Sequence, residues 1–494
     1  MLYFAPSKPG CMLFNSVDYL IFLPVVTALY FIIPSKWRWL LLLLASYYFY
    51  ACWKVEYAFI LLGITLIHYF LAIRIGEART KKHKKLYLVI GLVLSLGTLA
   101  AFKYLDFFTE SLNRLFLDFN IFHPLPLFHI LLPVGISFYI FQSLSYLLDV
   151  YREIKEPERH LGKFALYVAF FPQIVSGPIT RSGQLLPQIN DPRPFSQQRL
   201  VSGLKLMLWG YFKKVVIADR LGMFVSYVYD TPEQGKGLLV ILATLLFAFQ
   251  LYCDFSAYTD IARGTARILG YDLMINFNRP LIAKSLRDFW NRWHISLTTW
   301  FRDYLLYSLP YIRKNKVIYG LLYLNLVVTF LLMGFWHGAA WTFVIFGLFH
   351  GVMLVLETVT EQPRNRFFQV TRLSEHDFLR NALGTLVTMA LLAFSLVFFR
   401  ASSLGASFQL MAKAVDFSGT AENLRLMAKN YELIFGIMMI VVLLVAEYYQ
   451  EKRNMVLYIS GKPVWFRWSV YIGFVFFILV FGVLQKQKFI YFQF

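Results

Sequence analysis

Two histidines in this sequence have both the chemistry and the setting of reactive groups. His337 lies in Gly334-Phe-Trp-His-Gly-Ala-Ala-Trp, inside an apolar run from Leu321 to Leu356 that is long enough to enter a bilayer. His294 ends the basic, aromatic stretch Asn291-Arg-Trp-His. A histidine at bilayer depth must find hydrogen-bond partners or line a wet cavity. As a neutral general base, such an imidazole would contribute roughly 10²–10⁴ in rate.

Each histidine also has a structural interpretation that the sequence leaves open. His337 could bond a backbone carbonyl where helices pack, and His294 could belong to an interfacial anchor of Trp and Arg side chains. Trp336 and Trp341 flank His337 and could shield a site from water or simply pack.

A second group of residues suits an anionic ligand that carries a ring. Charge-assisted bonds from arginine bind phosphates, and tryptophan stacks on an adenine. A coenzyme A thioester has both features and is therefore a candidate donor, and no tightly bound cofactor is predicted. The candidate donor-binding residues are Arg287, Arg292, Trp293, Trp300 and Arg302.

Other site chemistries receive less support from the spacing of residues. His294, His337 and His350 match no common metal-ligand pattern, so no metal site is predicted. The segment Tyr252-Cys-Asp-Phe-Ser-Ala-Tyr-Thr-Asp places Asp254 and Tyr258 on one helix face. We interpret this polar stripe as support for a cavity rather than as the catalytic group.

Composition assigns the chain to the polytopic membrane proteins. Of 494 residues, 58% are hydrophobic and 15% charged, and the mean hydropathy is +0.56. The net charge of +20 comes from short basic loops that suit anionic lipid, so nucleic acid is not the predicted partner. We predict an all-α fold in a single membrane-embedded domain, 1–494. Residues 1–11 resemble an extension, and Met12 could be the natural start.

The distribution of Lys and Arg predicts the topology. Arg74–Lys85 and Arg279–Lys316 are strongly basic and should face the cytoplasm, as should Glu361–Arg380, while the mixed loop Lys103–Pro126 should face outward. Leu200–Val228 carries several charges, yet it must cross, shielded by neighbours, if both basic loops lie inside. We expect about eleven or twelve spans in all.

Two interrupted segments stand out among these spans. Phe164–Thr180 is broken by Pro and Gly and should be buried in protein or line a cavity. Leu321–Leu356 should enter the membrane and return, with His337 between its halves. Gly334 and Gly338 would let the helix bend or another backbone approach, and they would leave backbone room for a ligand.

Several motifs, in order along nearly the whole chain, resemble the membrane-bound O-acyltransferase family and its bacterial alginate O-acetyltransferase branch. They include Leu132-Pro-Val-Gly-Ile-Ser-Phe-Tyr, Phe171-Pro-Gln-Ile-Val-Ser-Gly-Pro, Asp288–Leu305 and Gly334-Phe-Trp-His-Gly-Ala-Ala-Trp. The resemblance implies a ring of helices around a tunnel, with His337 at the family's nearly invariant histidine and His294 at its second signature position.

From the residues and the resemblance together we expect an enzyme of the bacterial inner membrane, in contact with membrane lipids. It would pass acetyl from acetyl-CoA toward an extracytoplasmic polysaccharide, directly or through a partner acetyltransferase. His337 would be the base, and His294 would position or polarise the donor thioester. Two alternatives remain at this point: D-alanyl transfer from a carrier protein to teichoic acid, and a transporter or flippase of a polymer precursor.

Overall fold

The computed structural model describes residues 12–120, 124–128, 130–231, 235–313, 316–452, 459, 461–483 and 489–490. The chain forms two compact units: the first is Met1–Met207, Tyr258–Met274 and Tyr491–Phe494, and the second is Leu208–Ala257 and Ile275–Ile490. Two helices, α9 (Gln197–Tyr211) and α11 (Leu238–Ile268), contribute residues to both. The single domain expected from the sequence therefore stays a prediction.

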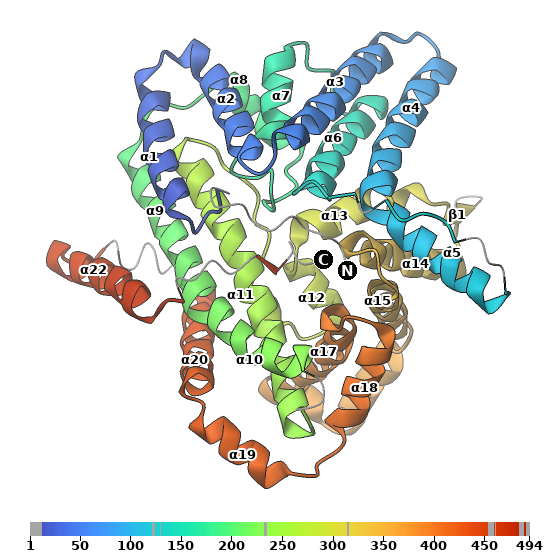
Figure 1. Cartoon of the computed structure of the whole chain (residues 1–494), viewed down its shortest axis with the longest axis vertical. Coiled ribbons are helices and arrows are strands. Elements are labelled where there is room, and N and C mark those ends of the chain that lie inside the picture. The colour runs from blue at the N-terminus through green and yellow to red at the C-terminus, as the bar shows by residue number, and fades with distance from the viewer. Residues whose placement is uncertain are drawn as a thin grey trace. The chain divides into compact units, whose positions relative to one another are not determined.

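The first unit is built of helices that lie side by side. Helix α6 is buried on nearly all sides, and it packs against α3 and α4, while α2 packs against α7 (Figure 1). The helices of this unit, beside parts of α9 and α11, are α1 (Val17–Ile32), η1 (Ser35–Trp37), α2 (Arg38–Ala51), α3 (Val55–Glu77), α4 (Lys81–Leu99), the π-helical turn η2 (Ala100–Tyr104), α5 (Leu105–Asp118), α6 (Ile136–Tyr151), α7 (Leu161–Ala169) and α8 (Ser182–Asn190).

The interrupted segment Phe164–Thr180 is buried along its entire length. Helix α7 ends at Ala169, and the irregular backbone that follows is bonded from within the unit; for example, the Phe171 N–H donates to Ser46 Oγ at 3.0 Å. Backbone groups freed by Pro and Gly need such partners away from water. The prediction that this segment is buried in protein is confirmed.

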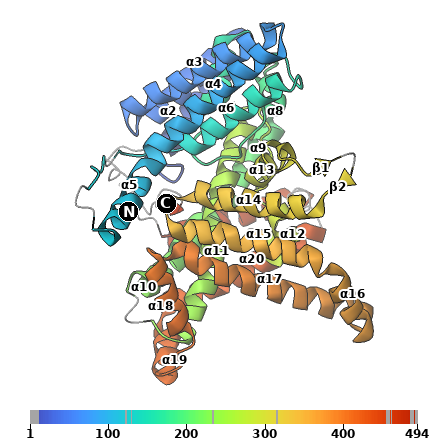
Figure 2. The same cartoon turned by 90° about the vertical axis from the view of Figure 1, so that its right-hand side faces the viewer.

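The second unit contains the candidate site. Helices α14, α15 and α17 lie side by side, with α15 in contact with both others (Figure 2). The described elements, beside parts of α9 and α11, are the π-helix η3 (Phe212–Ala218), α10 (Asp219–Asp230), η4 (Pro280–Ile282), α12 (Leu286–Arg292), α13 (Ile295–Tyr304), η5 (Leu306–Ser308), the antiparallel pair β1 (Ile312–Arg313) and β2 (Lys316–Val317), α14 (Tyr319–His337), α15 (Trp341–Val359), α16 (Glu361–Val370), η6 (Leu373–Glu375), α17 (Asp377–Arg400), α18 (Leu404–Ala414), α19 (Thr420–Lys429), α20 (Tyr431–Lys452) and α22 (Val464–Phe481).

Eight helices in the described part of the chain are long and apolar enough to cross a membrane. This confirms the all-α, multi-pass class. They are Val55–Glu77, Lys81–Asp118, Leu238–Ile268, Tyr319–His337, Trp341–Val359, Asp377–Arg400, Tyr431–Gln450 and Val464–Phe481. We expected about eleven or twelve spans, and three further apolar segments form the shorter helices α1, α2 and α6. The expected crossing at Leu200–Val228 is helical from α9 through α10, and its Lys213, Lys214 and Asp219 are buried, as shielding by neighbours requires.

The outward loop expected at Lys103–Pro126 is wrong as a loop. Helix α4 continues through the π-helical turn into α5, and only the residues after Asp118 leave the helix; 121–123 lie outside the described residues. Leu105, Phe108, Leu112 and Leu115 recur at helical spacing and are exposed, which is the pattern of an amphipathic helix. The mixed charge of this segment suggested a loop, whereas the helical spacing of its apolar residues indicates the helix.

Candidate functional site

The site is organised by a helical hairpin in which the backbones of α14 and α15 touch. A Cβ added at Gly347 would lie 2.9 Å from Gly334 Cα, and it would press on the Phe330 carbonyl oxygen as well. A Cβ at Gly338 would meet the ring of Phe343. The expected close approach of another backbone is confirmed at Gly334, whereas the expectation of room for a ligand is wrong, because α15 fills the space beside Gly334 and Gly338. The predicted break between two helical halves at His337 is confirmed, and entry into the membrane and return stay a prediction.

His337 is the last residue of α14 and is 5% exposed. Its ring has three aromatic neighbours, with ring centroids 5.1 Å away at Trp336, 5.3 Å at Phe399 and 6.1 Å at Phe346. The ring is therefore enclosed by aromatic side chains and almost closed to solvent. Trp341, the other tryptophan proposed as a shield, is 53% exposed, so Trp336 alone of the two encloses the site.

His294 sits at the junction of α12 and α13 in a left-handed conformation, with φ of 42°. This region costs a residue with a side chain about 1–3 kcal/mol, and such positions cluster at functional sites. The backbone is held there by neighbours: Ile295 N–H donates to the Asn276 carbonyl at 2.9 Å, and the side chain of His294 is fully buried. Burial lowers the pKa of His294 to about 3, so the ring is neutral at any physiological pH.

The contacts of Asn276 determine which nitrogen of His294 carries the proton. The backbone N–H of Ser296 donates to Asn276 Oδ1 at 3.1 Å, so this atom is the amide oxygen. His294 Nδ1 lies 3.2 Å from the same oxygen and must therefore donate to it. In the neutral ring the proton is on Nδ1, and Nε2 keeps its lone pair. His294 can accept a hydrogen bond or a proton at Nε2, and it cannot donate from that atom.

Trp336 connects the two histidines. Its ring lies 5.1 Å from that of His337 and 6.2 Å from that of His294, centroid to centroid, and both contacts are edge-on. Residues 43 positions apart in the sequence thus share one buried aromatic wall within the second unit. The pair predicted from sequence comes together in the fold.

His350 has a different character, because both of its nitrogens have structural partners. Trp290 Nε1–H donates to Nδ1 at 3.3 Å, and Nε2 lies 3.0 Å from Ser395 Oγ. No group of three or more His, Cys, Asp or Glu that could hold a metal occurs among the described residues.

The five residues predicted to bind the donor have separate neighbours. Arg292 pairs with Asp288 at 2.7 Å, Arg302 with Asp303 at 2.9 Å, and Arg287 donates to Thr358 Oγ1 at 2.9 Å. Trp293 and Trp300 are buried; Trp293 stacks on Phe289, and Trp300 packs on Phe301 and Tyr304. Donor binding by these residues stays a prediction.

Behind His294 lies a layer of buried charge on α11 and η3. Lys214 forms ion pairs with Asp219 at 2.7 Å and Asp254 at 2.8 Å, and Lys213 donates to Ser256 at 2.7 Å. Phe255, between Asp254 and Ser256 in sequence, places its ring 4.7 Å from that of His294.

This arrangement agrees with the interpretation of the α11 stripe as support for the site. The sequence showed the charges of this layer but not their partners. Asn276 carried no signal at all, because a lone amide in Met274-Ile-Asn-Phe resembles any loop residue.

Comparison with known proteins gives a consistent result. The family model of MBOAT, the membrane-bound O-acyltransferase family, matches residues 158–399. The "Probable alginate O-acetylase AlgI" of Azotobacter vinelandii is 42% identical over 351 residues, 70% of this chain and 68% of that protein. The "Peptidoglycan O-acetyltransferase" of Helicobacter pylori is 33% identical over 446 residues, 83% of this chain and 81% of that protein. The "Teichoic acid D-alanyltransferase" of Streptococcus thermophilus is 30% identical over 237 residues, which are 45% of this chain and 56% of that protein. The matched stretch contains both histidines of the site, and the chain belongs to the membrane-bound O-acyltransferase family as a multi-pass membrane O-acyltransferase.

Proposed function

We propose that this enzyme transfers acetyl from cytoplasmic acetyl-CoA to a hydroxyl on the outer side of the bacterial inner membrane, as a step in O-acetylation of an extracytoplasmic polysaccharide such as alginate or peptidoglycan. The acceptor hydroxyl belongs to the polymer itself or to a partner acetyltransferase. The observation that carries the proposal is the buried pair of histidines that both contact the ring of Trp336. Likeness to relatives named for O-acetylation of alginate and peptidoglycan supports the substrate class.

His337 acts as the general base in this proposal. Its ring is enclosed by aromatic side chains, and in its neutral form it takes the proton of the acceptor hydroxyl. The acceptor oxygen then attacks the thioester carbonyl carbon, the C–S bond breaks, and the coenzyme A thiolate leaves. The thiolate takes the proton back from the His337 imidazolium, which restores the base.

His294 positions the donor through Nε2. Of the two roles expected for it, polarising the thioester carbonyl requires a proton on Nε2, and Asn276 holds the proton on Nδ1. Positioning requires only an acceptor, and the amide N–H groups of the pantetheine arm of coenzyme A are donors of the right kind. Arg287, Arg292 and Arg302 remain our candidates for its phosphates, with Trp293 or Trp300 near the adenine; each arginine would exchange its present partner for the ligand.

The competing substrate is a D-alanyl thioester on a carrier protein, with teichoic acid as acceptor. A relative named for that reaction matches less than half of this chain, so acetyl transfer is the better supported proposal. A transporter of polymer precursors, the alternative from another class, is set aside because the family consists of acyltransferases.

The test uses purified full-length protein in lipid nanodiscs with radiolabelled acetyl-CoA, and separately with a D-alanyl-carrier thioester. We expect slow hydrolysis of acetyl-CoA that is lost in His337→Ala, while donor binding and thermal stability are retained, since a base removed from the chemistry mainly lowers kcat. His350→Asn is the matched control, because it also removes a buried imidazole from the hairpin. If His337→Ala keeps more than about a tenth of kcat, less than the loss expected for a general base, the assignment fails. If the protein turns over only the D-alanyl donor and not acetyl-CoA, then D-alanyl is the transferred group and the proposal of acetyl transfer fails.

A further inference from the structure

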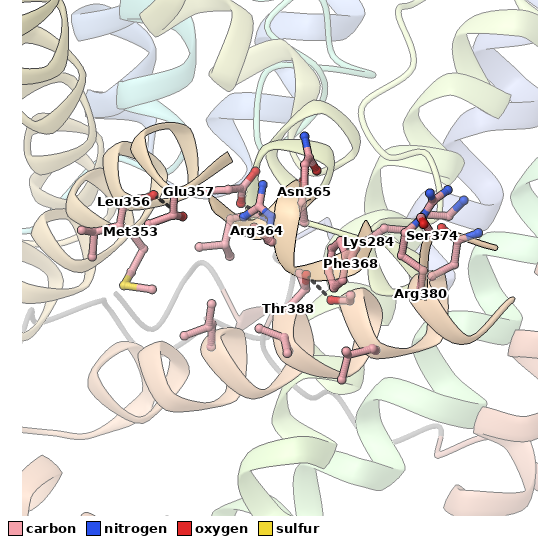
Figure 3. Close-up of a pocket in the computed structure, with 18 of the residues that line it drawn as sticks. Lys284, Met353, Leu356, Glu357, Arg364, Asn365, Phe368, Ser374, Arg380 and Thr388 are labelled. Carbon is pink, nitrogen blue, oxygen red and sulfur yellow. Dashed lines mark hydrogen bonds between the residues drawn. The ribbon is translucent and has the colours of Figure 1, made fainter. Parts of the chain in front are cut away.

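A cavity of about 630 Å³ lies in the second unit, away from the histidines. It is formed by the start of α12, the last turns of α15, helix α16 and the first turns of α17 (Figure 3). The volume is in the range of small-molecule sites. The hairpin places His337 at the opposite end of α15, which runs from Trp341 to Val359, so this cavity is distinct from the catalytic pair.

One part of the cavity wall is cationic. Lys284, Arg364 and Arg380 line it, and Glu357 is the one acid among its described lining residues. The Glu357 carboxylate is already bonded, because the Leu286 N–H at the start of α12 donates to it at 2.8 Å.

Two of the three cations have their charge available for a ligand. Arg380 pairs with Asp377, but neither Lys284 nor Arg364 makes an ion pair with any residue that the structure describes. Arg364 is partly buried and lines the cavity, whereas Lys284, which precedes α12 in sequence, is exposed at the cavity's edge. Cations without an ion-pair partner favour an anionic ligand.

The other part of the wall is apolar, and some of its side chains are exposed. Leu383, Val387 and Leu391 recur every fourth residue on α17, opposite Met353 and Leu356 of α15. Val387 is 52% exposed and Leu356 47%, on helices that are candidate membrane spans. In Figure 3, Met353 and Leu356 lie at one end of the cavity, Ser374 and Arg380 at the other, and Arg364 between them. A ligand that fills this space has an anionic head and an apolar tail.

We propose that this cavity is a binding site for an anionic phospholipid, with its phosphate at Lys284 and Arg364 and its acyl chains along α15 and α17. Basic pockets between transmembrane helices on the cytoplasmic side bind lipid head groups of this class. The cations of this cavity come from Arg279–Lys316 and Glu361–Arg380, two of the three segments whose charge predicts a cytoplasmic location, where anionic lipid is abundant. The alternative anion is the soluble donor, coenzyme A. Its adenine would need stacking partners, and Phe368 is the single aromatic residue among the described lining.

The test measures lipid binding by native mass spectrometry and by thermal stabilisation of the purified full-length protein. The probe is dioleoylphosphatidylglycerol, with dioleoylphosphatidylcholine as the neutral comparison. We expect the wild type to bind and be stabilised by the anionic lipid only. Lys284→Gln combined with Arg364→Gln should weaken that binding about tenfold or more, since each basic side chain near the surface contributes substantially to anionic lipid attraction. Arg366→Gln is the matched control, because Arg366 is exposed on the same helix, α16, and lies outside the cavity lining.

Three results would overturn the proposal. One is equal binding of phosphatidylglycerol by the double variant and the wild type. Another is displacement of the lipid by glycerophosphoglycerol, the chain-free head group, because the apolar wall would then contribute nothing. The third is a raised KM for acetyl-CoA in the double variant with lipid binding unchanged, which would assign the cavity to the donor. Melting of the lipid-free double variant at the wild-type temperature shows that any loss of binding is local.

Discussion

Substituting Gly347 by alanine should separate the hairpin and disable the enzyme without removing any reactive group. The new Cβ would lie 2.9 Å from Gly334 Cα, whereas carbon atoms in contact prefer roughly 3.5–4.0 Å. The Cβ would also press on the Phe330 carbonyl oxygen, and neither backbone atom can rotate away. Helices α14 and α15 must therefore move apart by about 1 Å. Overpacking of this kind costs about 1–3 kcal/mol.

The catalytic consequence should exceed the loss of stability. His337 ends α14, three residues beyond Gly334, so its ring moves with the displaced helix. A misplacement of about 1 Å can cost roughly 10²-fold in rate. We expect Gly347→Ala to lower kcat for acetyl-CoA turnover by one to two orders of magnitude while the melting temperature falls by only several degrees.

The assay compares kcat, donor KM and the melting temperature in nanodiscs. Gly320→Ala is the matched control, since Gly320 lies on the same helix, α14, and a Cβ there meets nothing within 4 Å. The control should keep wild-type activity. If Gly347→Ala also keeps kcat within about twofold, then the close contact of the two helices does not position His337, and the reasoning is refuted.

Three further outcomes follow from the buried polar groups. Asn276→Leu removes the oxygen that accepts the Nδ1 proton of His294, and the loss of this hydrogen bond, about 1.4 kcal/mol, should lower activity about tenfold. Asn276→Asp keeps an acceptor oxygen at this position and should retain more activity. Equal loss of activity in both variants would contradict the tautomer argument. The folded pKa of His294 is about 3 and its unfolded value about 6.5, so the unfolded chain binds the proton first as pH falls. Stability should therefore drop by about 2 kcal/mol between pH 7 and pH 5 through this group, and thermal melts of His294→Gln should lack that part of the pH dependence. Lys214→Met leaves two buried carboxylates without their cation and should cost about 3–5 kcal/mol in thermal unfolding, while Lys236→Met, which breaks an exposed pair, should cost less than about 1 kcal/mol; similar melting temperatures for the two variants would show that the buried pairs do not stabilise the fold.

The sequence by itself determined the class of the protein and the identity of its central pair. A mean hydropathy of +0.56 and long apolar runs leave few alternatives to membrane helices, because backbone groups in lipid must bond within their own segment. Histidine at bilayer depth is costly enough to mark His337 without any structure. The Pro-Gly breaks in Phe164–Thr180 likewise predicted a buried segment, for the same reason of backbone satisfaction.

Only the tertiary structure decided what each polar group does. The partners of His294, Lys214 and Lys213 lie far away in sequence or on another turn, and no local pattern specifies which donor meets which acceptor. The glycines beside His337 illustrate the limit: glycine permits close approach, and the sequence does not say whether a ligand or a helix approaches. The tautomer of His294 depends on one oxygen of Asn276, 18 residues earlier, which the fold alone brings within hydrogen-bonding distance.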